Sequence, residues 1–121
     1  MRITSVHHIQ LQFPAQSTED LRFFYSTVLG AQELPVPHQR QLLQFAVGEQ
    51  LLCFSPAASP APRSACQHVA FNVQGIDDLK NRFQAFGWHF IATQPSSTGL
   101  QAQQVYVKDP AGHQLEFLES H

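Results

Sequence analysis

Two histidines and one glutamate have the types and the spacing of a divalent-metal site. His8 and His68 lie at matching places in two similar stretches, VHHIQLQF at 6–13 and CQHVAFNV at 66–73, and Glu116 follows near the end of the sequence. Two neutral imidazoles and one carboxylate form the ligand set that suits Fe(II), and also Mn, Ni or Zn. Three protein ligands leave coordination positions open, as catalytic metals require.

An internal repeat must position these residues. His8 and His68 are 60 residues apart, and each is followed by apolar residues at helical spacing and then by a glycine, Gly30 or Gly87. This pattern predicts an amphipathic helix with a glycine cap. Two β-like runs follow each helix, at 31–35 and 40–47 and again at 88–93 and 103–108. The segment 48–54 then aligns with 112–118 at an offset of 64, which places Leu52 where Glu116 stands.

Each half therefore reads β-α-β-β-β, and the sequence predicts an α+β fold built from two βαβββ repeats. We assign residues 1–55 to repeat one, 56–65 to a Pro/Ala/Ser-rich linker and 66–121 to repeat two, within a single domain. A half of about 55 residues is marginal alone because small domains bury too little of their surface. Ser17 and Asp20 resemble a capping box at the start of the first helix.

Strand alternation predicts that each sheet has an apolar face under its helix and a mixed face opposite. A concave face with apolar walls and a few convergent polar groups is the usual form of a small-molecule site. We assign substrate binding to residues predicted for the mixed face: Gln10, Gln12, Phe54, Asn72, Gln104 and Tyr106. Glu116 and Tyr106 are the candidate catalytic residues. Tyr106 is either a general acid or hydrogen-bond donor to the substrate, or an ordinary amphipathic lining residue.

The thiols are not expected to react. Cys53 and Cys66 are too few for a disulfide scaffold. Their predicted alternation points them away from the mixed face, and we interpret them as reduced thiols of a cytoplasmic protein.

The motifs together resemble the vicinal oxygen chelate superfamily, which includes glyoxalases, bleomycin-resistance proteins, fosfomycin-resistance enzymes and extradiol dioxygenases. The resemblance covers nearly the whole chain and rests on HHIQL at 7–11, FYSTVLG at 24–30, QHVAF at 67–71 and DPAGHQLEF at 109–117. It implies a glyoxalase-like fold, in which paired βαβββ modules with curved mixed sheets form a metal cleft. It also implies a homodimer, often with each cleft built from both chains.

The resemblance further implies metal ligands on the first, fourth, fifth and eighth strands, which the alignment identifies as His8, Leu52, His68 and Glu116. Leucine cannot bind a metal, so three ligands remain. They match the sets of fosfomycin-resistance enzymes and extradiol dioxygenases rather than the four-ligand set of glyoxalases. The second residue of an H-H pair is the usual ligand in the family, which selects His8 over His7.

Composition and charge exclude some classes of binding partner. The formal charge of −2 and the scattered seven Lys and Arg give no footprint for nucleic acid. No apolar run reaches the 18 or so residues that a membrane helix needs. Lys108, Arg40 and Arg63 are the few candidate cations for the site, which argues against a phosphonate or glutathione-conjugate substrate. We therefore expect a small-molecule partner, no nucleic acid and no membrane.

Two functions remain open. The first is a metal-dependent enzyme that acts on a small oxygen-chelating substrate by lyase, transferase or ring-cleaving dioxygenase chemistry. The second is a metal-free binding protein of the bleomycin-resistance type, which sequesters a drug or metabolite. The presence of all three metal-ligand residues favours the enzyme.

Overall fold

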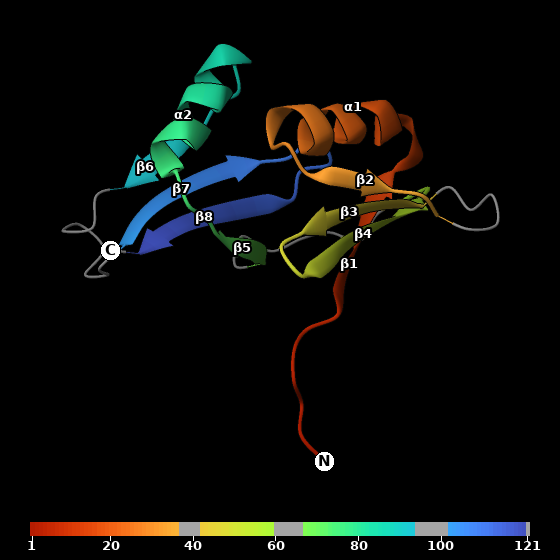
Figure 1. Cartoon of the computed structure of the whole chain (residues 1–121). Coiled ribbons are helices and arrows are strands. Elements are labelled where there is room, and N and C mark those ends of the chain that lie inside the picture. The colour runs from red at the N-terminus through yellow and green to blue at the C-terminus, as the bar shows by residue number, and fades with distance from the viewer. Residues whose placement is uncertain (37–41, 60–66, 94–101, 121) are drawn as a thin grey trace. The chain divides into compact units, whose positions relative to one another are not determined.

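The computed structural model describes residues 1–36, 42–59, 67–93 and 102–120 (Figure 1). The chain divides into two compact units, Met1–Pro62 and Arg63–His121, each with one four-stranded sheet. Both units have the predicted element order βαβββ, which confirms the α+β class and the internal repeat. Among the described residues, no helix is long and apolar enough to cross a membrane.

The first unit has strand order β1-β4-β3-β2, with β1 parallel to β4 and the other pairs antiparallel. Its elements are β1 (His8–Pro14), a 3₁₀ turn η1 (Ala15–Ser17), α1 (Thr18–Arg22), a π-helical stretch η2 (Phe23–Val28), β2 (Gln32–Leu34), β3 (Leu43–Val47) and β4 (Gln50–Ala57). Residues 1–7 precede the sheet as an extended segment (Figure 1). The strand β4 passes the predicted end of repeat one by two residues.

The predicted first helix is divided into the α-helical turn α1 and the wider η2. The amide of Leu29 donates to the carbonyl of Phe24, five residues back, at 2.9 Å. The helix ends at Gly30, whose φ of +75° is open to glycine at little steric cost. Phe24 and Tyr25 are fully buried, as helix-packing residues should be.

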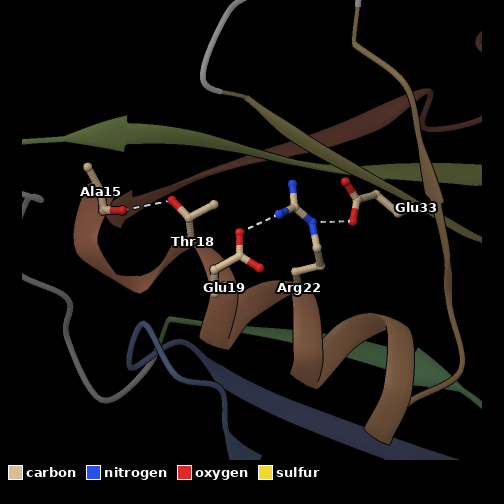
Figure 2. Close-up of polar contacts among 5 residues, drawn as sticks. All are labelled: Ala15, Thr18, Glu19, Arg22 and Glu33. Atoms are coloured by element: carbon tan, nitrogen blue, oxygen red, sulfur yellow. Dashed lines mark hydrogen bonds and ion pairs between the residues drawn. The ribbon is translucent and has the colours of Figure 1, made fainter.

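The predicted capping box is wrong. Ser17 makes no side-chain capping hydrogen bond; instead, Thr18 Oγ1 donates to the carbonyl of Ala15 at 2.7 Å (Figure 2). The reason is local, because Ser17 has φ −92° and ψ 7° at the end of a 3₁₀ turn. A capping side chain requires the extended backbone of an N-cap to reach the amides that follow.

An ion-pair group joins α1 to β2. The Arg22 guanidinium donates to Glu19 at 2.6 Å and to Glu33 at 2.7 Å (Figure 2). The hydrogen bond to Glu33 is the largest cause of a raised Arg22 pKa. These side chains are partly exposed, so each pair contributes at most about 1 kcal/mol.

The core of the first unit is aromatic and lies on the helix side of the sheet. The Phe54 ring lies 5.0 Å from Tyr25, 6.0 Å from Phe45 and 6.3 Å from Phe13, centroid to centroid. All four side chains are fully buried. Aromatic rings at these separations stabilise a core beyond their buried area.

The second unit repeats the topology with strand order β5-β8-β7-β6, in which β5 is parallel to β8. Its elements are β5 (His68–Asn72), α2 (Ile76–Ala85), β6 (Ile91–Thr93), β7 (Ala102–Lys108) and β8 (Gln114–Ser120). Its core stacks Phe117 on Phe71 at 5.3 Å and sets Phe83 of α2 against Phe117 at 6.0 Å.

Both ends of α2 are satisfied. At its C-terminus, Trp88 N donates to Phe83 O and Gly87 N to Gln84 O, with Gly87 at φ +66°, which is a Schellman motif. At its N-terminus, the Glu119 carboxylate of β8 accepts from the amides of Gly75 and Ile76. The glycine cap was predicted; the distant carboxylate was not.

The sheet register corrects the alignment of the two final strands. In β4, Leu52 pairs with Ile9 and Phe45, and it is fully buried on the helix face beside Phe54. Cys53 pairs with Gln10 and Gln44 on the opposite face. The first-repeat counterpart of Glu116 is therefore Cys53, and the predicted matching of Leu52 to Glu116 is wrong.

The cause lies in the two hairpin turns. The residues Gly48 and Glu49 alone join Val47 to its partner Gln50, whereas five residues, 109–113, separate Lys108 from Gln114. Gly48 and Gly112 each precede the first paired strand residue by two. However, His8 pairs with Leu51 whereas His68 pairs with Gln114, so matching the glycines shifts one strand by one position. A one-residue shift moves every side chain to the other face of the sheet.

Candidate functional site

The clearest polar contact of the second unit joins two of the predicted metal ligands. His68 Nε2 lies 3.2 Å from Glu116 Oε2. Glu116 is buried, with 8% of its surface exposed, whereas the His68 side chain is 44% exposed. A buried carboxylate is costly unless it has partners. The pair therefore sets a buried anion beside an accessible imidazole.

The other oxygen of Glu116 is held from the neighbouring strand β7. Gln104 Nε2 donates to Glu116 Oε1 at 2.6 Å, and the Tyr106 hydroxyl donates to the same oxygen at 3.4 Å. Thr93 of β6 donates its Oγ1 to the carbonyl oxygen of the Gln104 side chain at 3.3 Å. Three adjacent strands thus supply one hydrogen-bonded chain that ends on Glu116.

A tight turn sets the register that brings these strands together. Asp109 Oδ1 accepts from the amides of Ala111 and His113, both at 2.9 Å, and the Asp109 amide donates to the carbonyl of His113. Asp109 is buried, so this turn is a fixed part of the hairpin. It aligns Tyr106 directly with Glu116. The DPAG motif therefore positions the site rather than taking part in it.

Burial of the Tyr106 phenol, together with the negative charge of Glu116, raises the pKa of Tyr106 above its usual 10. Its hydroxyl donates to that carboxylate, which also favours the protonated form. Tyr106 is 37% exposed, so the phenol remains accessible. At neutral pH this side chain is therefore an accessible hydrogen-bond donor.

The first unit has a polar sheet face of its own. His8, Gln10 and Gln12 alternate as exposed residues along β1, as predicted. Gln10 Nε2 donates to Ser55 Oγ of β4. Cys53 also lies on this face, beside Gln10, so the prediction that it points away from the mixed face is wrong. Burial raises the pKa of Cys53, and a hydrogen bond from the Gln44 side chain opposes that rise.

His8 contacts its neighbour in sequence through one ring nitrogen. The Nδ1 atoms of His7 and His8 lie 2.9 Å apart, so one ring donates and the other accepts. The contact occupies Nδ1 of His8 and leaves Nε2 to other partners. A metal-binding histidine commonly donates its second ring N–H to a carboxylate, a carbonyl or water, and at His8 the partner is another imidazole.

Two of the three predicted ligands are spaced as ligands of one divalent cation would be. Two ligand atoms that each lie about 2.1 Å from a metal are about 3.0–3.4 Å apart when they occupy neighbouring coordination positions. The His68 Nε2 and Glu116 Oε2 atoms are 3.2 Å apart. Among the described residues, no three His, Cys, Asp or Glu side chains lie close enough together to hold a metal ion. The third predicted ligand, His8, belongs to the first unit.

The predicted binding residues differ in how far their side chains are buried. Gln10, Gln12 and Asn72 are exposed on their strands, and Tyr106 is partly so. Gln104 is only 5% exposed. Phe54 is fully buried against Tyr25, so its predicted place on the mixed face is wrong, for the register reason given above.

Sequence reasoning missed the contributions of Gln44, Ser55 and Thr93. Ser55 pairs with Gln12 and Thr93 pairs with Gln104, both predicted binding residues, whereas Gln44 pairs with Cys53. Strand alternation alone would have found Thr93, because it faces the same way as Ile91, which pairs with Tyr106. Cys66, Arg40 and Arg63 lie outside the described residues.

Known proteins share this architecture. The family model described as Glyoxalase/Bleomycin resistance protein/Dioxygenase superfamily matches residues 5–117. The Arabidopsis thaliana protein Glyoxylase I 4 is 21% identical over 126 residues, which span 96% of this chain and 71% of that protein.

Solved structures agree. A Bacillus anthracis glyoxalase family protein superposes with a TM-score of 0.86 at 29% identity over all of both chains. Lactoylglutathione lyase from Agrobacterium tumefaciens superposes with a TM-score of 0.71 at 24% identity, and the match covers 98% of this chain and 96% of that chain. The fosfomycin resistance protein FosX from Listeria monocytogenes superposes with a TM-score of 0.79 at 20% identity, and the match covers 99% of this chain and 96% of that chain. These last two likenesses concern the fold. With a family match over nearly its whole length, this chain belongs to the glyoxalase/bleomycin resistance protein/dioxygenase superfamily.

Proposed function

We propose that this protein is a divalent-metal-dependent enzyme acting on a small substrate that chelates through adjacent oxygen atoms. His8, His68 and Glu116 are its metal ligands, and Fe, Mn, Zn or Ni is the metal. Two imidazoles and one carboxylate suit these ions. The reaction is of lyase, transferase or ring-cleaving dioxygenase type, acting through stabilised negative charge on a substrate oxygen.

The proposal depends on one observation: the two oxygens of Glu116 have different partners. Oε1 accepts from Gln104 and Tyr106, while Oε2 is directed at His68 Nε2. Gln104 and Tyr106 therefore offset the cost of burying Oε1, whereas Oε2 faces a side chain that is 44% exposed. A cation shared by both side chains explains why the protein maintains this arrangement. A hydrogen bond has the same length, so metal content is the deciding measurement.

The chain's own residues supply orientation and protons. The single proton of the Tyr106 hydroxyl, which points to Glu116 in this structure, would turn to a substrate oxygen when the substrate binds. Gln10, Gln12 and Asn72 offer neutral amides that orient a polar substrate. A bound cation would polarise the substrate oxygens as a Lewis acid.

The charge on the site suggests a substrate with little negative charge. Lys108 pairs with Gln114, which pairs with His68, so it shares their sheet face. It is the one Lys or Arg on that face among the described residues of β5, β7 and β8. Although relatives include a lactoylglutathione lyase and a fosfomycin resistance protein, this face favours neither a glutathione conjugate nor a phosphonate.

A second candidate is a metal-free binding protein. The polar face of the first unit favours it, because Gln10, Gln12, Gln44 and Ser55 provide amide and hydroxyl groups but no charge. Thermal stabilisation by a ligand that survives chelator treatment would support the binding protein. Stabilisation that requires added metal would support the enzyme.

The decisive experiment is metal analysis of protein purified without a histidine tag. We expect close to one transition-metal ion per chain, and a sharp fall in Glu116→Gln. Glu49→Gln makes the same substitution at an exposed turn and should keep the metal. Protein that carries no metal and takes none up on titration would rule out the enzyme.

We also propose that the protein is a cytoplasmic homodimer. Light scattering after size exclusion measures the mass, and 13.6 kDa per chain separates monomer from dimer clearly. A monomer at micromolar concentration would contradict the dimer. Fractionation of the source cells tests the cytoplasmic location.

A further inference from the structure

The Gln104 side chain is almost completely buried, and both the nitrogen and the oxygen of its amide are hydrogen-bonded. Its nitrogen donates to Glu116 at 2.6 Å and its oxygen accepts from the Thr93 hydroxyl at 3.3 Å. Gln104 is 5% exposed. Buried polar side chains are hydrogen-bonded as a rule. Here, however, both partners lie on neighbouring strands and form one directed chain.

The donor and acceptor roles in this series of hydrogen bonds follow from the ionised carboxylate. An ionised carboxylate only accepts hydrogen bonds, so the amide must present its NH₂ to Glu116. Its carbonyl then faces β6, where Thr93 supplies a hydroxyl proton. The carboxylate itself opposes the flipped amide, which would turn a carbonyl oxygen toward it, and the Thr93 hydroxyl anchors the other end of the amide.

We propose that Gln104 is a positioning residue for the metal ligand Glu116, with Thr93 fixing the amide behind it. By holding Oε1, Gln104 leaves Oε2 directed at His68 Nε2. The inference rests on the proposed metal site and assigns Gln104 there, instead of to substrate contact as the sequence suggested. Partners behind a ligating carboxylate typically contribute about 10- to 100-fold to metal affinity.

The test measures Co²⁺ affinity of metal-depleted full-length protein by titration, following the visible absorption of the bound ion. Gln104→Met keeps the length of the side chain and removes both hydrogen bonds. We expect about 10- to 100-fold weaker binding and an altered absorption spectrum. Gln84→Met, the same substitution on an exposed position of α2, should match the wild type in both readouts.

A second pair of variants isolates the chain of hydrogen bonds from packing. Thr93→Val removes the hydroxyl at nearly constant volume, whereas Thr93→Ser retains it. We expect weaker Co²⁺ binding in Thr93→Val and near-normal binding in Thr93→Ser. Circular dichroism melts of every variant establish that the fold is retained, and the Thr93 pair decides the matter if Gln104→Met fails to fold.

The outcomes separate the two proposals. Wild-type protein that binds no Co²⁺ overturns the metal site and the positioning role with it. Wild-type binding that is equally tight in Gln104→Met, or in Thr93→Val when Gln104→Met is unfolded, overturns the positioning role alone. Weakening in Gln104→Met with recovery in Thr93→Ser supports both.

Discussion

Cys53 and Glu116 occupy the same position in the two repeats. Two residues after each repeat-equivalent histidine, Gln10 pairs with Cys53 and Ala70 pairs with Glu116. Both side chains lie on the face away from the helix. The fourth-strand position that the resemblance links to metal binding thus holds a thiol, and the leucine beside it belongs to the core.

This register predicts opposite responses to two neighbouring substitutions. Leu52→Ala should destabilise the protein by about 2–5 kcal/mol, because it leaves a cavity beneath the helix. Cys53→Ala, which removes one small group from the other face, should cost about 1 kcal/mol. Urea unfolding of both variants gives the comparison. A mild Leu52→Ala with a severe Cys53→Ala would restore the register that the glycine alignment implied.

The Cys53 thiol should react slowly at neutral pH. Burial raises its pKa above 9.0, and only the thiolate is nucleophilic. A raised folded-state pKa favours the protonated native form, so this group's stabilisation is complete below the unfolded pKa and is lost as pH rises through the folded value. Labelling by a disulfide reagent in a Cys66→Ser background, from pH 7 to 10, follows the thiol. Labelling at pH 7 as fast as that of urea-unfolded protein would contradict the assignment.

The elements that follow from local pattern were predictable. Helical spacing closed by Gly87 predicted α2 because a glycine in the left-handed region ends a helix by itself. The matching histidines predicted the repeat and both first strands. The face of β4 was not predictable from Gly48, because strand pairing and loop length together determine which side a residue faces.

Contacts between distant positions were equally hidden. Glu119 reaches the amides of Gly75 and Ile76 across 44 and 43 residues. No periodicity encodes such contacts, since they depend on side-chain direction after the sheet has formed. Sequence reasoning therefore found Glu116, Gln104 and Tyr106 as site residues, but not the hydrogen bonds that join them.

The Glu119 cap predicts a local loss of stability. Glu119→Ala leaves the amides of Gly75 and Ile76 without their carboxylate, which should cost about 1–2 kcal/mol. Glu49→Ala at the exposed turn is the matched control. Hydrogen exchange should accelerate at the first turn of α2, where the amide of Ile76 loses its acceptor. Unchanged exchange there, with unchanged unfolding in urea, would show that the cap contributes nothing.

Mixing two variants that each lack one metal ligand tests whether His8 contributes to the site of its own chain. In a homodimer with clefts built from both chains, His8→Ala and Glu116→Gln each lack a complete ligand set. Refolded together in equal amounts, they regain it in one cleft of each mixed dimer. Statistical mixing then restores about a quarter of the sites, because half of the dimers are mixed and each has one intact cleft. Sites within one chain would restore none. Co²⁺ titration of the mixture, against each variant refolded alone, distinguishes these arrangements, and recovery well beyond a quarter would contradict both.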